Sequence, residues 1–321
     1  MTKLLNIVIV LLAVVLVGVI LYPQVQASRP KVIRFACDST VACLPFIIGI
    51  EESLFVNNRI IPELQFYSDP DEALADLFAG KVDVGIYPWA SVLKRAVEDG
   101  DTLRVFLSEE FRITLPVDAI VTTRKSRISS IAGLQKRKLG YPPQLRGYIK
   151  PFLLQSALPP ELVATVELPL QELLPGLAAG TIDAAWLLEP FLCSLDTTQL
   201  LVLQTGALPK YVSAPFPGAA VGFSTEFMNS DKVLLSRLKI STDAAAAYAE
   251  GSADKARVLL SRYLPVAEEA ALTCRLPEFQ RLVEINKPAV RTLASRLAVS
   301  GVLAGDIETD RMFVEPAKMT R

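Results

Sequence analysis

The sequence predicts an α/β protein built from two similar halves, because one short pattern occurs twice. Residues 80–85 read G-K-V-D-V-G, and residues 180–185 read G-T-I-D-A-A. An apolar segment with helical spacing precedes the first copy, and a short apolar run typical of a buried strand continues from each. The glycine suits the left-handed turn that ends a helix. Helix, glycine turn and strand form half of a βαβ unit, and 321 residues are enough for two such domains with full cores.

The remaining elements follow from hydrophobic periodicity and from turn residues. Besides the two repeat strands that begin at residues 82 and 182, we expect strands at 31–36, 61–67, 103–108, 118–123, 137–140, 163–168, 200–204 and 219–224. Helices are expected at 42–54, 69–79, 90–97, 128–134, 148–156, 170–177, 232–250, 252–263, 265–273 and 289–299. Residues 206–218 are rich in proline and are expected to be irregular. From residue 231 onward the pattern is mostly helical, which predicts a helical C-terminal tail packed against the first half.

The N-terminal segment, residues 1–27, is predicted to be a signal peptide or a membrane anchor. Residues 4–22 carry no charged side chain and follow Lys3, as in membrane-directed segments. Val25 and Ala27 suit cleavage before Ser28. An uncleaved anchor to the inner membrane is the alternative, because the apolar run is just long enough to span a bilayer. No cysteine follows the apolar run at the distance of a lipobox, so a lipoprotein is not expected. With either a signal peptide or an anchor, the expected location of the protein is periplasmic or extracytoplasmic.

Composition excludes several classes of function. The chain has 33 basic and 34 acidic residues, a net charge of −1, and no long run of like charge, so nothing indicates nucleic acid or an acidic partner. It has no histidine, which rules out a Ser-His-Asp triad, a Cys-His pair and any histidine-ligated metal. No cofactor is expected. An enzyme would have to rely on another group, such as Asp38 or Glu189 as a general base.

Four cysteines, Cys37, Cys43, Cys193 and Cys274, allow three complete pairings, and the sequence does not choose among them. None stands in a C-x-x-C pair, which argues against a thiol redox motif or a structural zinc site. Cys37 and Cys43 are close enough to close one loop if the protein is exported. Buried free thiols are the alternative.

Candidate binding residues stand where predicted strands end, because ligands of open α/β sheets bind beyond the carboxyl ends of the strands. One group is the polar turn after the first strand, where side chains can also cap the next helix. Two further groups follow the repeat strands, and a fourth opens the helix at 148–156. Asp83 and Asp183 are interpreted as structural hydrogen-bonding residues at strand entrances. The candidate ligand-binding residues are Asp38, Ser39, Thr40, Tyr87, Trp89, Arg146, Tyr148, Trp186 and Glu189.

The order and spacing of seven segments resemble the substrate-binding proteins of ABC importers from about residue 32 to the C-terminus. The most similar branch is the one for nitrate, sulfonate, taurine and thiamine-pyrimidine precursors. The segments are I-R-F-A (33–36), E-E-S-L-F (51–55), L-F-A-G-K-V-D-V-G (77–85), A-I-V-T-T (119–123), S-I-A-G-L-Q-K-R-K-L-G (130–140), G-T-I-D-A-A-W-L-L-E-P (180–190) and V-G-F-S-T-E-F-M (221–228).

This resemblance implies a two-lobed type II periplasmic-binding-protein fold with two crossover strands, near residues 116–118 and 215–218. Lobe I would be formed by residues 32–116 plus 219–321, and lobe II by residues 117–218. The ligand would lie between the lobes, in contact with the four groups of candidate residues. Closure around it would be recognised by the permease subunits of the importer.

We therefore expect a monomeric, non-enzymatic solute-binding protein that captures a small nutrient for an ABC importer. A membrane-anchored ligand sensor is the alternative if residues 4–22 are retained. An enzyme of pyrimidine-precursor metabolism on the same scaffold is the less favoured alternative, because the related enzymes use a histidine of their own. Among ligands, the aromatic candidates favour a ring or a cation, Glu189 favours an amine, and Arg146 would favour an anion. A ring-bearing or amine-containing nutrient is preferred over a simple oxyanion.

Overall fold

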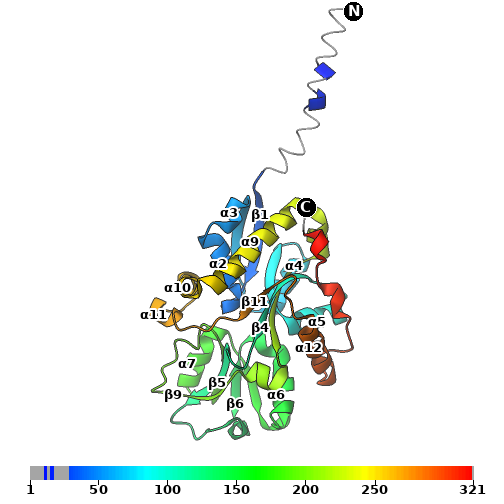
Figure 1. The fold of residues 1–321 in the computed structure, drawn as a ribbon. Helices are drawn as coiled ribbons and strands as arrows, with labels where there is room; N and C mark the ends of the chain where they lie inside the picture. The colour runs from blue at the N-terminus through cyan, green and yellow to red at the C-terminus, as the bar shows by residue number, and fades with distance from the viewer. Residues whose placement is uncertain (1–10, 13–14, 18–28, 320–321) are drawn as a thin grey trace, which may run out of the picture.

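The protein folds around two β-sheets, one in each of two lobes (Figure 1). The computed structural model describes residues 11–12, 15–17 and 29–319. The six-stranded sheet has the order β11-β4-β10-β3-β1-β2, and the five-stranded sheet has the order β7-β6-β8-β5-β9. We call the parts of the chain around them lobe I and lobe II. The lobe boundaries at residues 116–118 and 215–218 stay a prediction.

Ten of the eleven strands in the two sheets fall close to their predicted positions, and β11 was not predicted. They are β1 (Lys31–Cys37), β2 (Ile60–Phe66), β3 (Val84–Pro88), β4 (Arg104–Phe111), β5 (Asp118–Thr123), β6 (Lys138–Tyr141), β7 (Ala164–Glu167), β8 (Ala184–Leu188), β9 (Leu200–Thr205), β10 (Phe216–Phe223) and β11 (Glu278–Arg281). The α-helices are α2 (Leu44–Glu51), α3 (Leu54–Asn57), α4 (Pro70–Phe78), α5 (Trp89–Glu98), α6 (Ile149–Gln155), α7 (Leu173–Ala178), α8 (Thr225–Ser230), α9 (Lys232–Gly251), α10 (Ala253–Tyr263), α11 (Glu268–Ala271) and α12 (Lys287–Val299).

The two sheets share one plan. In lobe I, β2, β1 and β3 are parallel, and β10 runs antiparallel between β3 and β4. In lobe II, β7, β6 and β8 are parallel, and β5 runs antiparallel between β8 and β9. The antiparallel strand of each sheet begins directly after the chain arrives from the other lobe. The crossovers therefore lie toward the β4 and β9 side of the sheets, and β2 and β7 form the opposite edges.

The repeated pattern begins the third parallel strand in both lobes. The backbone N–H of Asp83 donates to Arg34 O (2.9 Å), and Asp83 Oδ2 accepts from the Arg34 N–H (2.9 Å). Asp183 makes the same pair of hydrogen bonds with Lys138, both at 2.8 Å. Gly80 and Gly180 adopt φ angles of 71° and 72°, so the predicted left-handed turns are confirmed. Each aspartate joins its strand to the neighbouring strand, as interpreted from the sequence.

The C-terminal tail differs from the sequence prediction in one element. Helices α9 and α12 cover lobe I (Figure 1) and contact α2 and α5, respectively. Residues 278–281, however, form the strand β11 on the edge of the six-stranded sheet, antiparallel to β4. Of the segment at residues 4–22, only residues 11–12 and 15–17 are among the described residues. No helix in the described part of the chain has the length and apolar character needed to cross a membrane.

Two disulfides are present, Cys37–Cys43 and Cys193–Cys274. The first closes the loop after β1, which is the loop closure that the short spacing suggested. The second joins the segment after β8 in lobe II to the segment before β11 in lobe I. The free-thiol alternative for these cysteines is therefore wrong in this structure.

Asp118, the first residue of β5, is a buried carboxyl whose titration should affect stability. Its Oδ2 accepts from Trp186 Nε1 (2.9 Å) and from the Leu208 N–H (3.1 Å), and its Oδ1 has no partner. Burial raises the pKa of Asp118 to about 6 from an ordinary value of 3.8. Because the folded protein holds this proton more tightly than the unfolded chain does, protonated Asp118 contributes to the free energy of unfolding. The contribution is complete below the ordinary pKa of 3.8 and is lost as the pH rises through the folded pKa of about 6.

We therefore expect the free energy of unfolding of Asp118→Asn to exceed that of the wild type by about 3 kcal/mol at pH 8. At pH 4 the two proteins should have nearly the same free energy of unfolding. The amide keeps an oxygen for both donors and carries no charge. Urea denaturation of both proteins at the two pH values measures the difference. A difference that does not change with pH would contradict this assignment.

Candidate binding site between the lobes

A cavity of about 40 Å³ lies between the lobes, at the ends of strands from both sheets. This volume holds roughly three water molecules. Lobe I contributes the turn after β1 and the ends of β3 and β4, lobe II contributes β8 and two short helical turns, and the crossover strand β10 completes the wall. The lining residues are Asp38, Thr40, Ala42, Ile86, Pro88, Glu109, Phe111, Gln144, Leu145, Tyr148, Leu188, Leu208, Phe216, Gly218 and Ala219.

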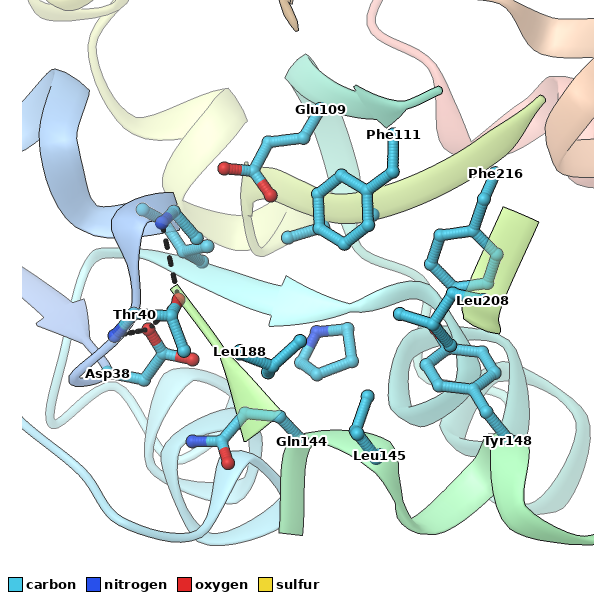
Figure 2. Close-up of a pocket in the computed structure, with 15 residues that line it drawn as sticks. Asp38, Thr40, Glu109, Phe111, Gln144, Leu145, Tyr148, Leu188, Leu208 and Phe216 are labelled. Carbon is cyan, nitrogen blue, oxygen red and sulfur yellow. Dashed lines mark hydrogen bonds between the residues drawn. The ribbon is translucent and has the colours of Figure 1, made fainter. Parts of the chain in front are cut away.

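One end of the cavity is polar (Figure 2). Asp38 Oδ1 accepts from the Thr40 N–H (3.0 Å) and from the Thr40 hydroxyl (2.6 Å), and Thr40 Oγ1 accepts from the Ala42 N–H (3.2 Å). Burial raises the pKa of Asp38, while Thr40 and the Gln144 amide partly offset the rise. Gln144 Oε1 has no hydrogen-bond partner. The turn thus holds a buried carboxyl in a fixed position beside an unused amide oxygen.

Glu109 is the second carboxyl of this end. It stands near the end of β4, its side chain is 1% exposed, and its Oε1 has no hydrogen-bond partner. Burial raises the pKa of Glu109 well above its usual range, and the charge of Asp38 raises it further. A buried carboxyl without a partner destabilises a folded protein, so the cavity holds acceptor capacity that the protein itself does not use.

The other end of the cavity is aromatic (Figure 2). The rings of Phe111 and Phe216 lie 5.5 Å apart, and Tyr148 meets Phe216 edge to face at 5.0 Å. Gly218 makes this arrangement possible, because a Cβ at this position would lie 2.3 Å from the Phe111 ring. The Tyr148 oxygen accepts from the Ala90 N–H at the start of α5 (2.9 Å), which leaves the phenolic hydrogen free to donate.

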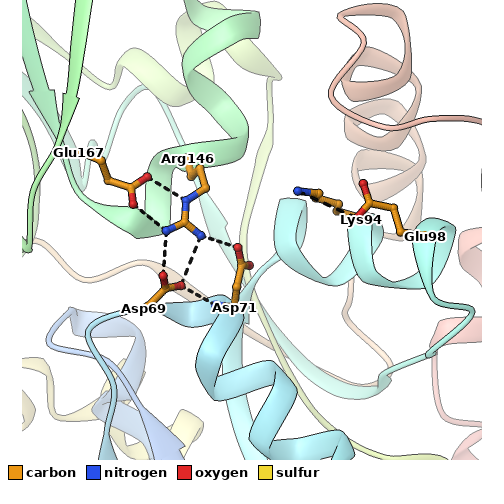
Figure 3. Close-up of polar contacts among 6 residues, drawn as sticks. All are labelled: Asp69, Asp71, Lys94, Glu98, Arg146 and Glu167. Carbon is orange, nitrogen blue, oxygen red and sulfur yellow. Dashed lines mark hydrogen bonds and ion pairs between the residues drawn. The ribbon is translucent and has the colours of Figure 1, made fainter.

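Two further contacts between the lobes flank the cavity. At the β2 and β7 edge, Arg146 of lobe II binds Asp69 of lobe I (2.8 Å), Asp71 of lobe I and Glu167 of its own lobe (2.6 Å) (Figure 3). We call this group the Arg146 latch. Burial alone would raise the pKa of Asp69, but the hydrogen bonds and charge of Arg146 hold it below its ordinary value. The latch lies at the β2 and β7 edge, opposite the β4 and β9 side of the sheets.

On the crossover side, Glu189 and the Cys193–Cys274 disulfide connect the lobes. Glu189 Oε1 accepts from the Arg275 N–H of lobe I (3.2 Å), and Oε2 accepts from the Cys193 N–H (3.1 Å). Burial raises the pKa of Glu189 to about 7. A Glu189 oxygen and both sulfurs lie within 4.8 Å of one another, but the disulfide occupies both sulfurs. The arrangement is a structural link between the lobes.

Sequence comparison identifies the family. The profile of the NMT1/THI5-like family matches residues 42–250, more than half of the chain. The chain belongs to this family. A search of curated protein sequences finds no significant match.

Solved structures with the same fold as this NMT1/THI5-like protein include two ligand-binding proteins. One is the alkanesulfonate-binding protein SsuA from Xanthomonas axonopodis pv. citri bound to MOPS, with 14% identity, a TM-score of 0.73, and coverage of 89% of this chain and 99% of that chain. The other is the periplasmic nitrate-binding protein NrtA from Synechocystis PCC 6803, with 11% identity, a TM-score of 0.71, and coverage of 88% and 86%. These likenesses confirm the two-lobed periplasmic-binding-protein fold.

Of the nine candidate ligand-binding residues, the structure brings Asp38, Thr40 and Tyr148 to the cavity. Ser39 stands in the same turn but is not among the lining residues. Arg146 and Glu189 lie at the boundary between the lobes. Arg146 is bound by carboxylates, and Glu189 accepts hydrogen bonds from backbone N–H groups.

The remaining three candidates are core side chains of the two lobes. Trp89 donates to Ser108 Oγ (3.1 Å) and packs against Phe313. Trp186 donates to Asp118 and packs against Phe152. Tyr87 is fully buried, and its hydroxyl has no partner. Tyr87 lies between Ile86 and Pro88 in β3, and because both neighbours line the cavity, its ring points to the opposite face of the strand. Trp89 is the first residue of α5 and Trp186 is the middle residue of β8, and both rings are fully buried in contacts within their own lobes.

Sequence reasoning missed the cavity residues Glu109, Phe111, Gln144 and Phe216. The strand prediction stopped at Ser108, whereas β4 continues to Phe111. Ligands of open α/β sheets bind beyond the carboxyl ends of the strands. With the strand end placed at Phe111 instead of Ser108, this expectation would have selected Glu109 and Phe111. Phe216 falls in the segment 206–218 that the sequence predicts to be irregular, and Gln144 falls between the predicted strand at 137–140 and the predicted helix at 148–156, so the sequence does not predict either as part of a cavity wall.

The Arg146 latch should contribute to closure. Arg146→Gln removes the cation and leaves Asp69, Asp71 and Glu167 close together. Because the guanidinium is about one-third exposed, we expect the closed state to lose about 1 kcal/mol after screening by solvent. Small-angle X-ray scattering should show a larger radius of gyration. Lys94→Gln is the matched control, since it breaks the Lys94–Glu98 pair within α5 (Figure 3). Equal radii for both variants would exclude a contribution of the latch.

Proposed function

We propose that this protein is an extracytoplasmic solute-binding protein that captures a small molecule between its two lobes for an ABC importer. The observation that carries the proposal is the cavity whose wall comes from both sheets and from the crossover strand. A ligand there contacts both lobes only when they are closed. Binding energy would therefore shift the equilibrium from open to closed, and permease subunits would recognise the closed form.

The disulfides support a location outside the cytoplasm. Disulfides form and persist in oxidising compartments, and all four cysteines are paired. The neighbours in fold include a sulfonate-binding and a nitrate-binding protein, which supports transport over catalysis. We propose that the protein acts as a monomer that meets its permease only in the ligand-bound form.

A binding role is also supported by the state of the carboxyls that were considered as general bases. Asp38 Oδ1 accepts two hydrogen bonds from Thr40, and both oxygens of Glu189 accept from backbone N–H groups. Glu189 is not among the residues that line the cavity. A general base requires a proton donor of the substrate within hydrogen-bond reach, and for Glu189 the lobe contacts fill that space.

Thermal unfolding with a panel of small cations, zwitterions, neutral solutes and anions tests the proposal. A ligand at one hundred times its dissociation constant stabilises by roughly 2.7 kcal/mol, which gives a clear rise in melting temperature. Small-angle X-ray scattering should show that the stabilising solute makes the protein more compact. Stabilisation without compaction, or no stabilising solute in the whole panel, would count against capture between the lobes.

A further inference from the structure

The polar end of the cavity presents acceptors that nothing in the protein satisfies. Glu109 Oε1 and Gln144 Oε1 are both buried and have no hydrogen-bond partner, and both residues line the cavity beside Asp38. Buried acceptors normally accept a hydrogen bond. Two buried acceptors without a donor in the same cavity therefore indicate a ligand that donates hydrogen bonds. The two carboxyls, Asp38 and Glu109, give this end a capacity for negative charge.

The wall offers little to an anion. Among the described residues that line the cavity, none is a lysine or an arginine, and Arg146 is held outside by three carboxylates. The Tyr148 hydroxyl is one donor available to a ligand. A sulfonate or a nitrate would lie beside two carboxyls without a cationic partner, and removing a charge from water without such a partner is strongly unfavourable.

We propose that the ligand of this site is a small organic cation with a primary ammonium group, bound by Glu109, Gln144 and Asp38. An ammonium carries three N–H donors and no acceptor, which matches three acceptor side chains at one end of the cavity. The inference rests on the proposed function, because it names the ligand class of the same site.

The rest of the cavity fits the organic part of such a ligand. Tyr148 and Phe216 lie on the side of the cavity away from Asp38, and Phe111 lies between them and Glu109 (Figure 2). The three rings provide apolar contact and ring faces that attract a cation. A volume of about 40 Å³ suits a ligand with few non-hydrogen atoms in the closed form. This favours an aliphatic amine over the ring-bearing nutrient that the sequence also allowed.

The two carboxyls are poised to change their state when a cation arrives. Burial raises the pKa of Glu109 well above its usual range, and the Asp38 charge adds to this effect. The ammonium would supply the opposite charge that the cavity lacks and would favour the ionised carboxylates.

Isothermal titration calorimetry on the full chain, with ethylammonium and ethanolamine as probes, tests the assignment. Ethanol and ethylene glycol are the neutral counterparts, and nitrate and methanesulfonate are the anions. We expect saturable binding of at least one ammonium probe and none of the neutral compounds or anions. Glu109→Gln, which keeps the size of the side chain, should weaken ammonium binding at least tenfold.

Glu161→Gln makes the same charge change on the exposed surface and should leave the affinity unchanged. Thermal unfolding of the ligand-free variants verifies that both are folded. Saturable binding of nitrate or methanesulfonate without binding of an ammonium probe would overturn the ligand class and leave capture between the lobes intact. Binding of an ammonium probe that is equally strong in Glu109→Gln would also overturn it, as would failure of both ammonium probes to bind the wild-type chain.

Discussion

Replacement of Cys193 and Cys274 by serine should lower the free energy of unfolding by about 4.5 kcal/mol, mainly because the disulfide restricts the unfolded chain. The two cysteines are 81 residues apart in sequence, and the stabilisation grows with the length of the closed loop. The same replacement of Cys37 and Cys43, which are 6 residues apart, should cost about 2 kcal/mol by the same relation. Urea denaturation under non-reducing conditions compares the two variants.

The ranking of the two variants is the decisive outcome, because both lose one disulfide between buried or half-buried cysteines. An equal or smaller loss for Cys193 and Cys274 would show that this disulfide does not restrict the chain in the wild-type protein. Peptide mapping of the non-reduced protein identifies the bonded pairs independently. The Cys193–Cys274 variant should also retain ligand binding, since the disulfide lies on the crossover side, away from the Arg146 latch.

Gly147→Ala should weaken ligand binding by about 30-fold or more, because the new Cβ would lie 2.4 Å from Ala90 Cβ of the other lobe. Overpacking of this kind costs typically 1–3 kcal/mol. The clash also separates the Tyr148 oxygen from the Ala90 N–H, a net loss of about 1 kcal/mol. Both penalties fall on the closed state alone, so the open protein should keep its stability. Calorimetry with the identified solute and scattering with and without it measure the effect.

The clash at Gly147 can be reversed from the other side. Ala90→Gly removes the opposing methyl group, and the next nearest atoms to the new Cβ lie at 3.7 and 3.9 Å, which is ordinary contact. The double variant should therefore bind the ligand nearly as tightly as Ala90→Gly alone. Gly251→Ala, where no atom lies within 4 Å, is the control that should bind as wild type. Unchanged affinity in Gly147→Ala would show that the lobes do not approach each other in this way.

The local sequence pattern correctly predicted how the two repeat strands begin, but it did not predict most of the residues that line the cavity. The turn at Gly80 and the hydrogen bonds of Asp83 involve neighbouring elements, so a short motif defines them. The four residues of β11 depend on pairing with β4, far away in sequence, and their local pattern gives no sign of a strand. The sequence places Trp89 and Trp186 near predicted strand ends, where an aromatic residue suits either a core or a ligand, whereas in the structure Trp89 begins α5 and Trp186 is the middle residue of β8. Their partners Ser108 and Asp118 decide the matter, and periodicity does not reveal such pairs.

The positions of the antiparallel strands also set an order for synthesis. All five strands of lobe II come from residues 118–205, so its sheet can be completed as soon as that stretch has emerged. The sheet of lobe I has β10 between β3 and β4, and it stays divided until residues 216–223 are available. Domains fold as units as the chain appears. Lobe I, whose synthesis begins first, is thus the lobe whose sheet is completed last. Until β10 is synthesised, β3 and β4 keep unpaired edges.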